Sequence, residues 1–142
     1  MDHLWKIVDL QCVRTSGKPG LLAIAELPKH VLGLFSSAPR VYFIVNDSGD
    51  WSVRGGHFHP EGGKKELIIA LQGRIEFDLH AAAGCGREVL ESPTRGLVIP
   101  NGVWHGVRLS PGAILLSIAS TLYAPDEAIA ARPCQHRDGE GS

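Results

Sequence analysis

Residues 66–80 read ELIIALQGRIEFDLH, and they carry the strongest indication of the fold class. Its second half, 74–80, alternates strictly between polar and apolar side chains. Successive side chains of a strand point to opposite faces, so this period predicts a strand with one buried face. The first half, 66–72, is a short apolar run, which predicts a second, more deeply buried strand. Between them, Gln72-Gly73 predicts a tight turn that joins the two strands as a hairpin.

The same chemistry recurs along the chain, and 17 glycines and 9 prolines punctuate it. Short apolar runs rich in β-branched residues predict further strands. They lie at 40–46, 96–100 and 113–120, with weaker candidates at 4–10 and 21–26. Many short strands separated by turn signals favour a sandwich or a small barrel. The chain lacks the Cys…Trp…Cys pattern of an immunoglobulin sandwich, so we predict an all-β jelly-roll β-barrel.

One helix is predicted, near the end of the chain. Residues 124–131 carry Pro125 near a first-turn position, with acidic residues just inside. The following tail, 132–142, is polar. No internal repeat or linker is visible, so we expect a single domain over 1–142 with its core at about 4–123.

Composition and charge exclude several classes of protein. The chain is 44% hydrophobic and 20% charged, its net charge is −1, and it has no basic block, so nucleic acid is not an expected partner. No apolar run approaches the roughly 20 residues that span a bilayer, and the first residues do not resemble a signal peptide. Cys12, Cys85 and Cys134 lie far apart without a pairing motif, and Cys85 falls in a predicted turn. We therefore expect a cytoplasmic protein without a disulfide scaffold and with no membrane partner.

The sequence VRGGHFH, residues 53–59, contains the clearest chemical signal. If this segment is extended, His57 and His59 project from the same face of a strand. Gly55-Gly56 directly before them allows a bulge or a close backbone approach. From the pair alone, the two histidines could be metal ligands, catalytic bases or ordinary surface residues.

Further fragments place the pair in a wider pattern. Glu66 follows the histidines and is itself followed by six residues and Gly73; later come Gly96 and PNGVWH, 100–105. Together these fragments resemble the two signature motifs of the cupin superfamily, which implies a cupin-type jelly roll. The spacer between His59 and Glu66 is longer than in most cupins.

A narrower resemblance follows from PRVYFIVNDSGDWSVRGGHFH, residues 39–59. It resembles the central stretch of the dTDP-sugar 3,4-ketoisomerases, cupin enzymes of deoxysugar and amino-sugar biosynthesis, and the likeness covers roughly 20–123. The resemblance departs at SGKPG, 16–20, and after the histidines, where Pro60 replaces the usual lysine. By analogy with related cupins we expect a homodimer.

The resemblance implies an isomerase that acts on a nucleotide-linked (dTDP) 4-keto-6-deoxyhexose without a cofactor. His57 is implied as the base that removes the C3 proton, giving an enediol, and His59 as its proton-relay partner. Tyr42 is implied as an acid or oxyanion donor.

The expected substrate-binding residues are two arginines and the end of the second motif. Arg40 and Arg54 are expected to hold phosphate or sugar oxygens. Trp104 and His105 are expected to close the far wall, where the sugar can stack on the indole. Lys64 and Lys65 indicate a solvated turn, with steering of a diphosphate as the alternative.

Two other functions fit the same residues. In the first, His57, His59, Glu66 and His105 hold a divalent metal such as Fe, Mn, Ni or Zn, for dioxygenase or isomerase chemistry. In the second, the chain is a non-catalytic sugar-binding cupin, which would keep its ligand affinity when both histidines of the pair are lost.

Overall fold

The computed structural model describes residues 4–13, 16–17, 22–24, 40–60, 63–122 and 129. Within these residues the secondary structure consists of strands without a helix. The strands are β1 (Lys6–Asp9), β2 (Gln11–Val13), β3 (Leu22–Ile24), β4 (Arg40–Val45), β5 (Ser52–His57), β6 (Glu66–Gln72), β7 (Ile75–Ala81), β8 (Gly84–Leu90), β9 (Arg95–Ile99), β10 (Trp104–Leu109) and β11 (Ile114–Ala119).

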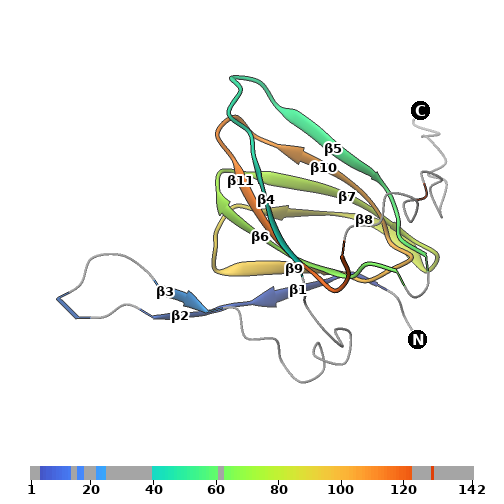
Figure 1. Cartoon of the computed structure of the whole chain (residues 1–142), viewed down its shortest axis with the longest axis horizontal. Helices are drawn as coiled ribbons and strands as arrows, with labels where there is room; N and C mark the ends of the chain where they lie inside the picture. Colours follow the sequence, from blue (N-terminus) through green and yellow to red (C-terminus); the bar gives the residue numbers. More distant parts are fainter. Residues whose placement is uncertain are drawn as a thin grey trace, which may run out of the picture.

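Two antiparallel sheets face each other (Figure 1). One has the strand order β1-β9-β6-β11-β4, and the other β5-β10-β7-β8. Strands β2 and β3 pair with each other and project away from the two sheets (Figure 1). This double-sheet arrangement confirms the prediction of an all-β, cupin-type jelly roll.

The main core lies between the two sheets. The alternation predicted for 74–80 is confirmed, because Ile75, Phe77 and Leu79 are 0–1% exposed. They pack in one cluster with apolar side chains of the facing sheet, including Leu97 and Leu115. Full burial of such a side chain stabilises the fold by roughly 1.5–3 kcal/mol, so the inward face of β7 holds the two sheets together.

The predicted hairpin between 66–72 and 74–80 is wrong. Strand β6 pairs with β9 and β11, whereas β7 pairs with β8 and β10, so the chain passes from one sheet to the other at Gly73. The physical reason is burial on two faces: β6 contributes Ile68 to the main core and Leu67 and Ile69 to a second apolar cluster. The half-polar β7 instead lies in the other sheet. Gly73 makes this corner with φ +77°, and a Cβ there would lie 2.8 Å from the Cα of Ala113.

Two smaller predictions also change. The turn predicted around Cys85 is part of strand β8. Cys85 is also disulfide-bonded, so the expectation that the cysteines are unpaired is wrong there.

The predicted helix, 124–131, lies outside the described residues except at Ile129, which forms an antiparallel bridge with Phe58. The tail, 132–142, lies outside them too. Among the described residues, no helix is long and apolar enough to cross a membrane.

Candidate active site

A pocket of about 170 Å³ opens between the two sheets. Strands β4, β5, β6, β10 and β11 line it, together with the residue two positions before β6. Its lining residues are Tyr42, Ile44, Arg54, Gly55, His57, Lys64, Glu66, Ile68, His105, Val107 and Leu115. One end of the pocket is thus polar and the other apolar, which is typical of a small-ligand site.

A β-bulge sets the position of the first histidine. His57 of β5 is paired with His105 of β10, but the next pair is Gly55 with Gly106, so Gly56 is the extra residue. Gly55 and Gly56 both have positive φ, 73° and 84°. A Cβ at Gly55 would lie 2.6 Å from the carbonyl oxygen of His105, so only glycine allows this close approach. The GG pair therefore places two imidazoles opposite each other.

Three imidazoles meet at this point. The ring centroids lie 5.0 Å apart for His57 and His59, 5.1 Å for His57 and His105, and 6.1 Å for His59 and His105. The prediction that His57 and His59 share a face is confirmed, since one ligand nitrogen from each of the three rings lies within 4.8 Å of the others. The sequence placed His105 in the same motif set, and the fold brings it into the cluster.

The histidines are held in the neutral state. Burial lowers the pKa of His59 to about 4, with help from the positive charge of Lys64. Burial, the neighbouring His105 and the Lys64 ammonium also lower the pKa of His57. The pKa of His105 is lowered by burial, against the opposing effect of Glu66. A neutral imidazole has a free lone pair, so each of these rings can accept a proton or bind a cation near neutral pH.

Hydrogen bonds distinguish the rings from one another. The Nδ1 of His105 lies 3.1 Å from the carbonyl oxygen of Val103. A carbonyl can only accept, so Nδ1 carries the proton and the Nε2 lone pair is free. Both ring nitrogens of His59 are buried and have no hydrogen-bond partner in the described part of the chain. Such a buried polar group is costly unless a ligand or solvent satisfies it, so His59 is suited to contact a bound molecule.

Glu66 is the centre of a second polar group. The Tyr42 hydroxyl donates to Glu66 Oε1 at 2.9 Å, and the Lys64 ammonium contacts the same oxygen. Burial opposes ionisation of Glu66, but Lys64, His105 and the Tyr42 hydroxyl together hold its pKa below the ordinary value. Burial, followed by the Glu66 carboxylate, raises the pKa of Tyr42. Tyr42 is therefore a protonated donor rather than a phenolate.

The predicted binding residues separate into two groups. Arg54 lines the pocket. The guanidinium carbon of Arg40 lies 4.7 Å from the centroid of the Tyr42 ring, as in a cation–π contact. The fold thus places Arg54 in the pocket lining and Arg40 beside Tyr42, which lines the same pocket.

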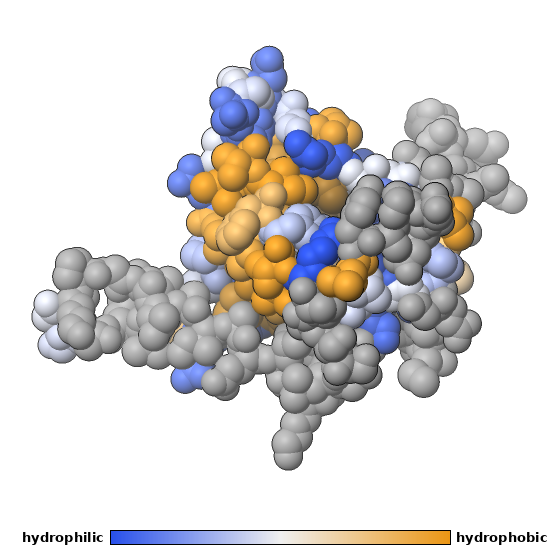
Figure 2. Space-filling view, in the orientation of Figure 1, coloured by the Kyte–Doolittle hydropathy of each residue, from blue (hydrophilic) through white to orange (hydrophobic). Residues whose placement is uncertain are grey.

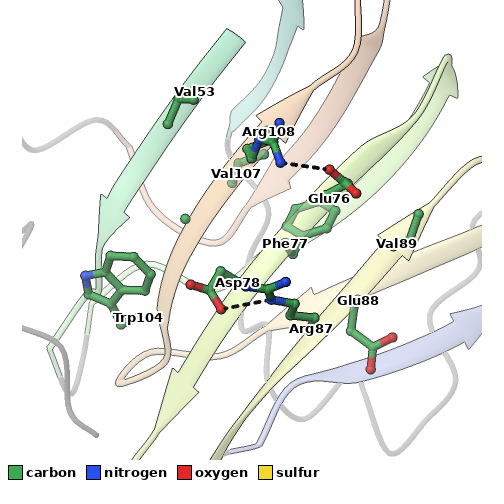
Figure 3. Close-up of a pocket in the computed structure, with 11 residues that line it drawn as sticks. Val53, Glu76, Phe77, Asp78, Arg87, Glu88, Val89, Trp104, Val107 and Arg108 are labelled. Carbon is green, nitrogen blue, oxygen red and sulfur yellow. Dashed lines mark hydrogen bonds and ion pairs between the residues drawn. The ribbon is translucent and has the colours of Figure 1, made fainter. Parts of the chain in front are cut away.

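Trp104 lies elsewhere. It precedes His105 in β10 and so points to the opposite face of that strand. There it stacks edge-on against His80, with 5.0 Å between ring centroids, and lines a groove of about 280 Å³ on the outer face of the sheet. Figure 3 shows Trp104 in this groove with Asp78 and Arg108. The structure therefore does not bring Trp104 together with His105, as the sequence-based expectation required.

Lys64 is the residue that sequence reasoning missed. The expectation of a solvated turn is wrong at this position, because Lys64 is 9% exposed and lines the pocket. One signal was available: Lys64 and Glu66 are two residues apart, and in extended chain such residues share a face. Without the fold, nothing in the sequence showed that this face points inward.

The donor set partly fits a metal ion. Three neutral imidazoles suit a divalent transition metal, and the unpartnered nitrogens of His59 are consistent with one. Glu66, however, is already neutralised by the Lys64 ammonium. A metal here would thus be held by His57, His59 and His105, and it would supply a Lewis acid beside the pocket.

Comparisons with known proteins agree with this fold. The family model described as "FdtA: WxcM-like, C-terminal" matches residues 4–132. A 3,4-ketoisomerase from Helicobacter canadensis is 29% identical, with 92% of each chain covered and a TM-score of 0.75. The TDP-quinovose 3,4-ketoisomerase WlaRB from Campylobacter jejuni is 28% identical, with 89% of this chain and 92% of that chain covered and a TM-score of 0.76.

QdtA, a sugar 3,4-ketoisomerase from Thermoanaerobacterium thermosaccharolyticum, shares the fold at 23% identity, with 92% and 90% coverage and a TM-score of 0.73. No curated protein matches the chain. The resemblance to dTDP-sugar 3,4-ketoisomerases is confirmed. The family model matches nearly the whole length of this chain, so the chain belongs to the FdtA family, described as WxcM-like, C-terminal.

Proposed function

We propose that the chain is an isomerase that converts a nucleotide-linked (dTDP) 4-keto-6-deoxyhexose into its 3-keto isomer. The observation that carries this proposal is that His57, His105 and Tyr42 line one pocket, with His59 clustered against the two histidines. Two ketoisomerases at 28–29% identity support it. The pocket, about 170 Å³, is smaller than pockets that enclose drug-sized ligands. We propose that it receives the sugar ring and leaves the nucleotide outside.

His57 acts as the base. Its lowered pKa keeps the imidazole neutral near pH 7, so it can take the C3 proton that the C4 carbonyl acidifies. His59, next to it, relays the proton or orients the base. Tyr42 stays protonated, so it can donate to an oxygen of the substrate if its bond to Glu66 opens.

Arg40 and Arg54 bind the anionic part of the substrate. Arg54 is exposed at the lining of the pocket, and Arg40 lies over Tyr42 at the start of β4. Their planar guanidinium groups suit phosphate oxygens. Trp104 contributes indirectly, because its side chain supports β10 from the outer face.

The proposal is tested with dTDP-4-keto-6-deoxyglucose in deuterated water. The protein is expected to form the 3-keto isomer and to introduce deuterium. His57→Asn is expected to lose at least 100-fold in turnover while TDP binding changes little. Unchanged substrate with the unmodified protein would contradict the isomerase. A non-catalytic sugar-binding cupin would instead bind the nucleotide sugar without turnover or exchange.

A metal-dependent cupin is the second candidate, and the three clustered imidazoles are the observation that favours it. Metal analysis of the purified protein, followed by assay after treatment with a chelator, separates the two. We expect turnover to survive chelation, because the proposed proton transfers use side chains alone. Loss of turnover that only one divalent metal restores would favour the metal-dependent reaction.

We propose a homodimer in which the outer face of β4 contacts a second copy. Figure 2 shows apolar side chains gathered over this edge strand. Along the register of β4 and β11 the outward residues are all apolar: Val41 with Ile118, Phe43 with Leu116, and Val45 with Ile114. Phe43 is 62% exposed. A contiguous apolar patch on a sheet edge is costly in water and marks an interface. Light scattering is expected to give a dimer for the unmodified protein and a monomer for Phe43→Glu.

A further inference from the structure

Lys64 has a fixed position that a solvated turn would not give it. The Gly63 N–H donates to the Pro60 carbonyl at 2.8 Å, and a Cβ at Gly63 would lie 3.2 Å from the Cβ of His59. The next residue, Lys65, makes two backbone hydrogen bonds with Ser120. The Lys65 N–H donates to the Ser120 hydroxyl at 2.9 Å, and the Lys65 carbonyl accepts from the Ser120 N–H at 3.0 Å. The backbone on either side of Lys64 is therefore tied down, and the side chain points into the pocket.

Lys64 lines the pocket beside two other polar residues, Glu66 and Tyr42. It contacts Glu66 and lies 5.5 Å from the centroid of the Tyr42 ring. Its charge also lowers the pKa of His57 and His59. Two of the three imidazoles that could hold a metal, His57 and His105, line the same pocket as Lys64. An ammonium has three donors and Glu66 takes one, so Lys64 can also donate to a ligand in the pocket that it lines.

We infer that Lys64 is a catalytic electrophile that occupies the place of a metal cation in this site and donates a hydrogen bond to the substrate's C4 oxygen. The inference deepens the proposed function and rests on it. Glu66, the one carboxylate beside the three imidazoles in the described part of the pocket lining, is bound by this internal cation.

The proposed step balances without any added oxidant or reductant. His57 removes the C3 proton, the electrons of the C3–H bond form a C3=C4 double bond, and the carbonyl pair moves onto O4. Lys64 stabilises the resulting oxyanion by donating to it within a buried site, where such a donor acts most strongly. The proton held by the histidines then returns to C4, and the C3 hydroxyl gives up its own proton, which passes to the O4 oxyanion. C3 and O3 each lose one hydrogen, and C4 and O4 each gain one.

Lys64→Met tests the inference, because methionine keeps the length of the side chain and removes the charge. We expect kcat to fall 10²–10³-fold, as for the loss of one oxyanion donor, with KM and TDP affinity within about threefold. The same substitution at exposed Lys6 is the control and should leave kcat unchanged. A kcat within threefold of the unmodified protein, or a loss confined to KM and TDP affinity, would overturn the inference.

A second readout does not depend on turnover. Removal of the internal cation frees Glu66 beside three neutral imidazoles, so Lys64→Met is expected to bind Zn²⁺ or Ni²⁺ at least tenfold more tightly in calorimetry. Unchanged metal affinity would overturn the inference even if the isomerase proposal fails.

Because Lys64→Met leaves Glu66 unpaired, the variant Lys64→Met/Glu66→Gln removes both charges and tests the loss of kcat in a site without an unpaired charge. Inactive unmodified protein would count against the proposed function, and the metal titration would still decide the role of Lys64.

Discussion

The bulge at Gly55-Gly56 yields a prediction in which one substitution is the control for the other. Both glycines have positive φ, so alanine at either position adopts a strained backbone. Only Gly55 also faces a backbone atom: its Cβ would lie 2.6 Å from the His105 carbonyl oxygen. At Gly56 the nearest atom is a Trp104 ring carbon at 3.8 Å, an ordinary contact. Gly55→Ala therefore adds a clash that Gly56→Ala lacks.

The size of the effect follows from these contacts. With alanine, the positive φ destabilises the folded state by roughly 1–2 kcal/mol. The lower entropy of the unfolded alanine chain offsets roughly 0.4–1 kcal/mol of this loss. Gly56→Ala should therefore destabilise the protein by about 1 kcal/mol. At Gly55 the strands must also part by about 0.4 Å to bring the contact to 3.0 Å, and such overpacking costs roughly 1–3 kcal/mol more. Gly55→Ala should thus cost about 2–4 kcal/mol.

The assay is urea and thermal unfolding of both variants together with their turnover. For a domain of this size, 1 kcal/mol corresponds to roughly 3–4 °C in Tm, so the two variants should differ by roughly 3–12 °C in Tm. Because the shift falls on the His57–His105 pair, kcat should fall roughly 10–100-fold in Gly55→Ala and less than threefold in Gly56→Ala. Equal losses of stability and of kcat in the two variants would refute the role assigned to the backbone contact.

Three further predictions concern single groups. Asn46→Ala should cost about 1–3 kcal/mol in urea unfolding, because its amide donates to the carbonyls of Asp50, Leu109 and Ser110 at 2.8–3.1 Å; an unchanged midpoint would contradict this. Burial lowers the pKa of His59 to about 4 from about 6.5. As pH falls, the unfolded chain therefore binds a proton at His59 before the folded chain does. Up to about 3 kcal/mol of folding stability should be lost between pH 6.5 and 4. His59→Gln should flatten that pH profile of urea midpoints, and an equally steep profile would count against it. Trp5→Phe should cost about 1 kcal/mol in thermal unfolding, because its indole N–H donates to Glu88 at 3.0 Å; no change in Tm would show the bond to be dispensable.

Some of the fold could be predicted because its signal is local. The alternation of 74–80 is a property of neighbouring residues, and Ile75, Phe77 and Leu79 are buried as it requires. Which strands pair is not local. The sequence Gln72-Gly73 is compatible both with a hairpin turn and with a corner between two sheets. The chain forms the corner because both faces of β6 are buried in apolar clusters. The helix prediction for 124–131 relied on capping chemistry alone, and it stays a prediction outside the described residue Ile129, which forms an antiparallel bridge with Phe58.

Residue patterns did not predict strands β8 and β10, but they predicted β4, β6, β7, β9 and β11, the shared face of His57 and His59, and the family to which the chain belongs. These follow from residue spacing, since side chains two apart in a strand must point the same way. The sequence had already grouped His105 with them, but the inward position of Lys64 and the place of Trp104 on the outer face became clear only from the fold. The direction in which a strand's face points depends on which sheet covers it, and that is set by packing between residues far apart in the chain.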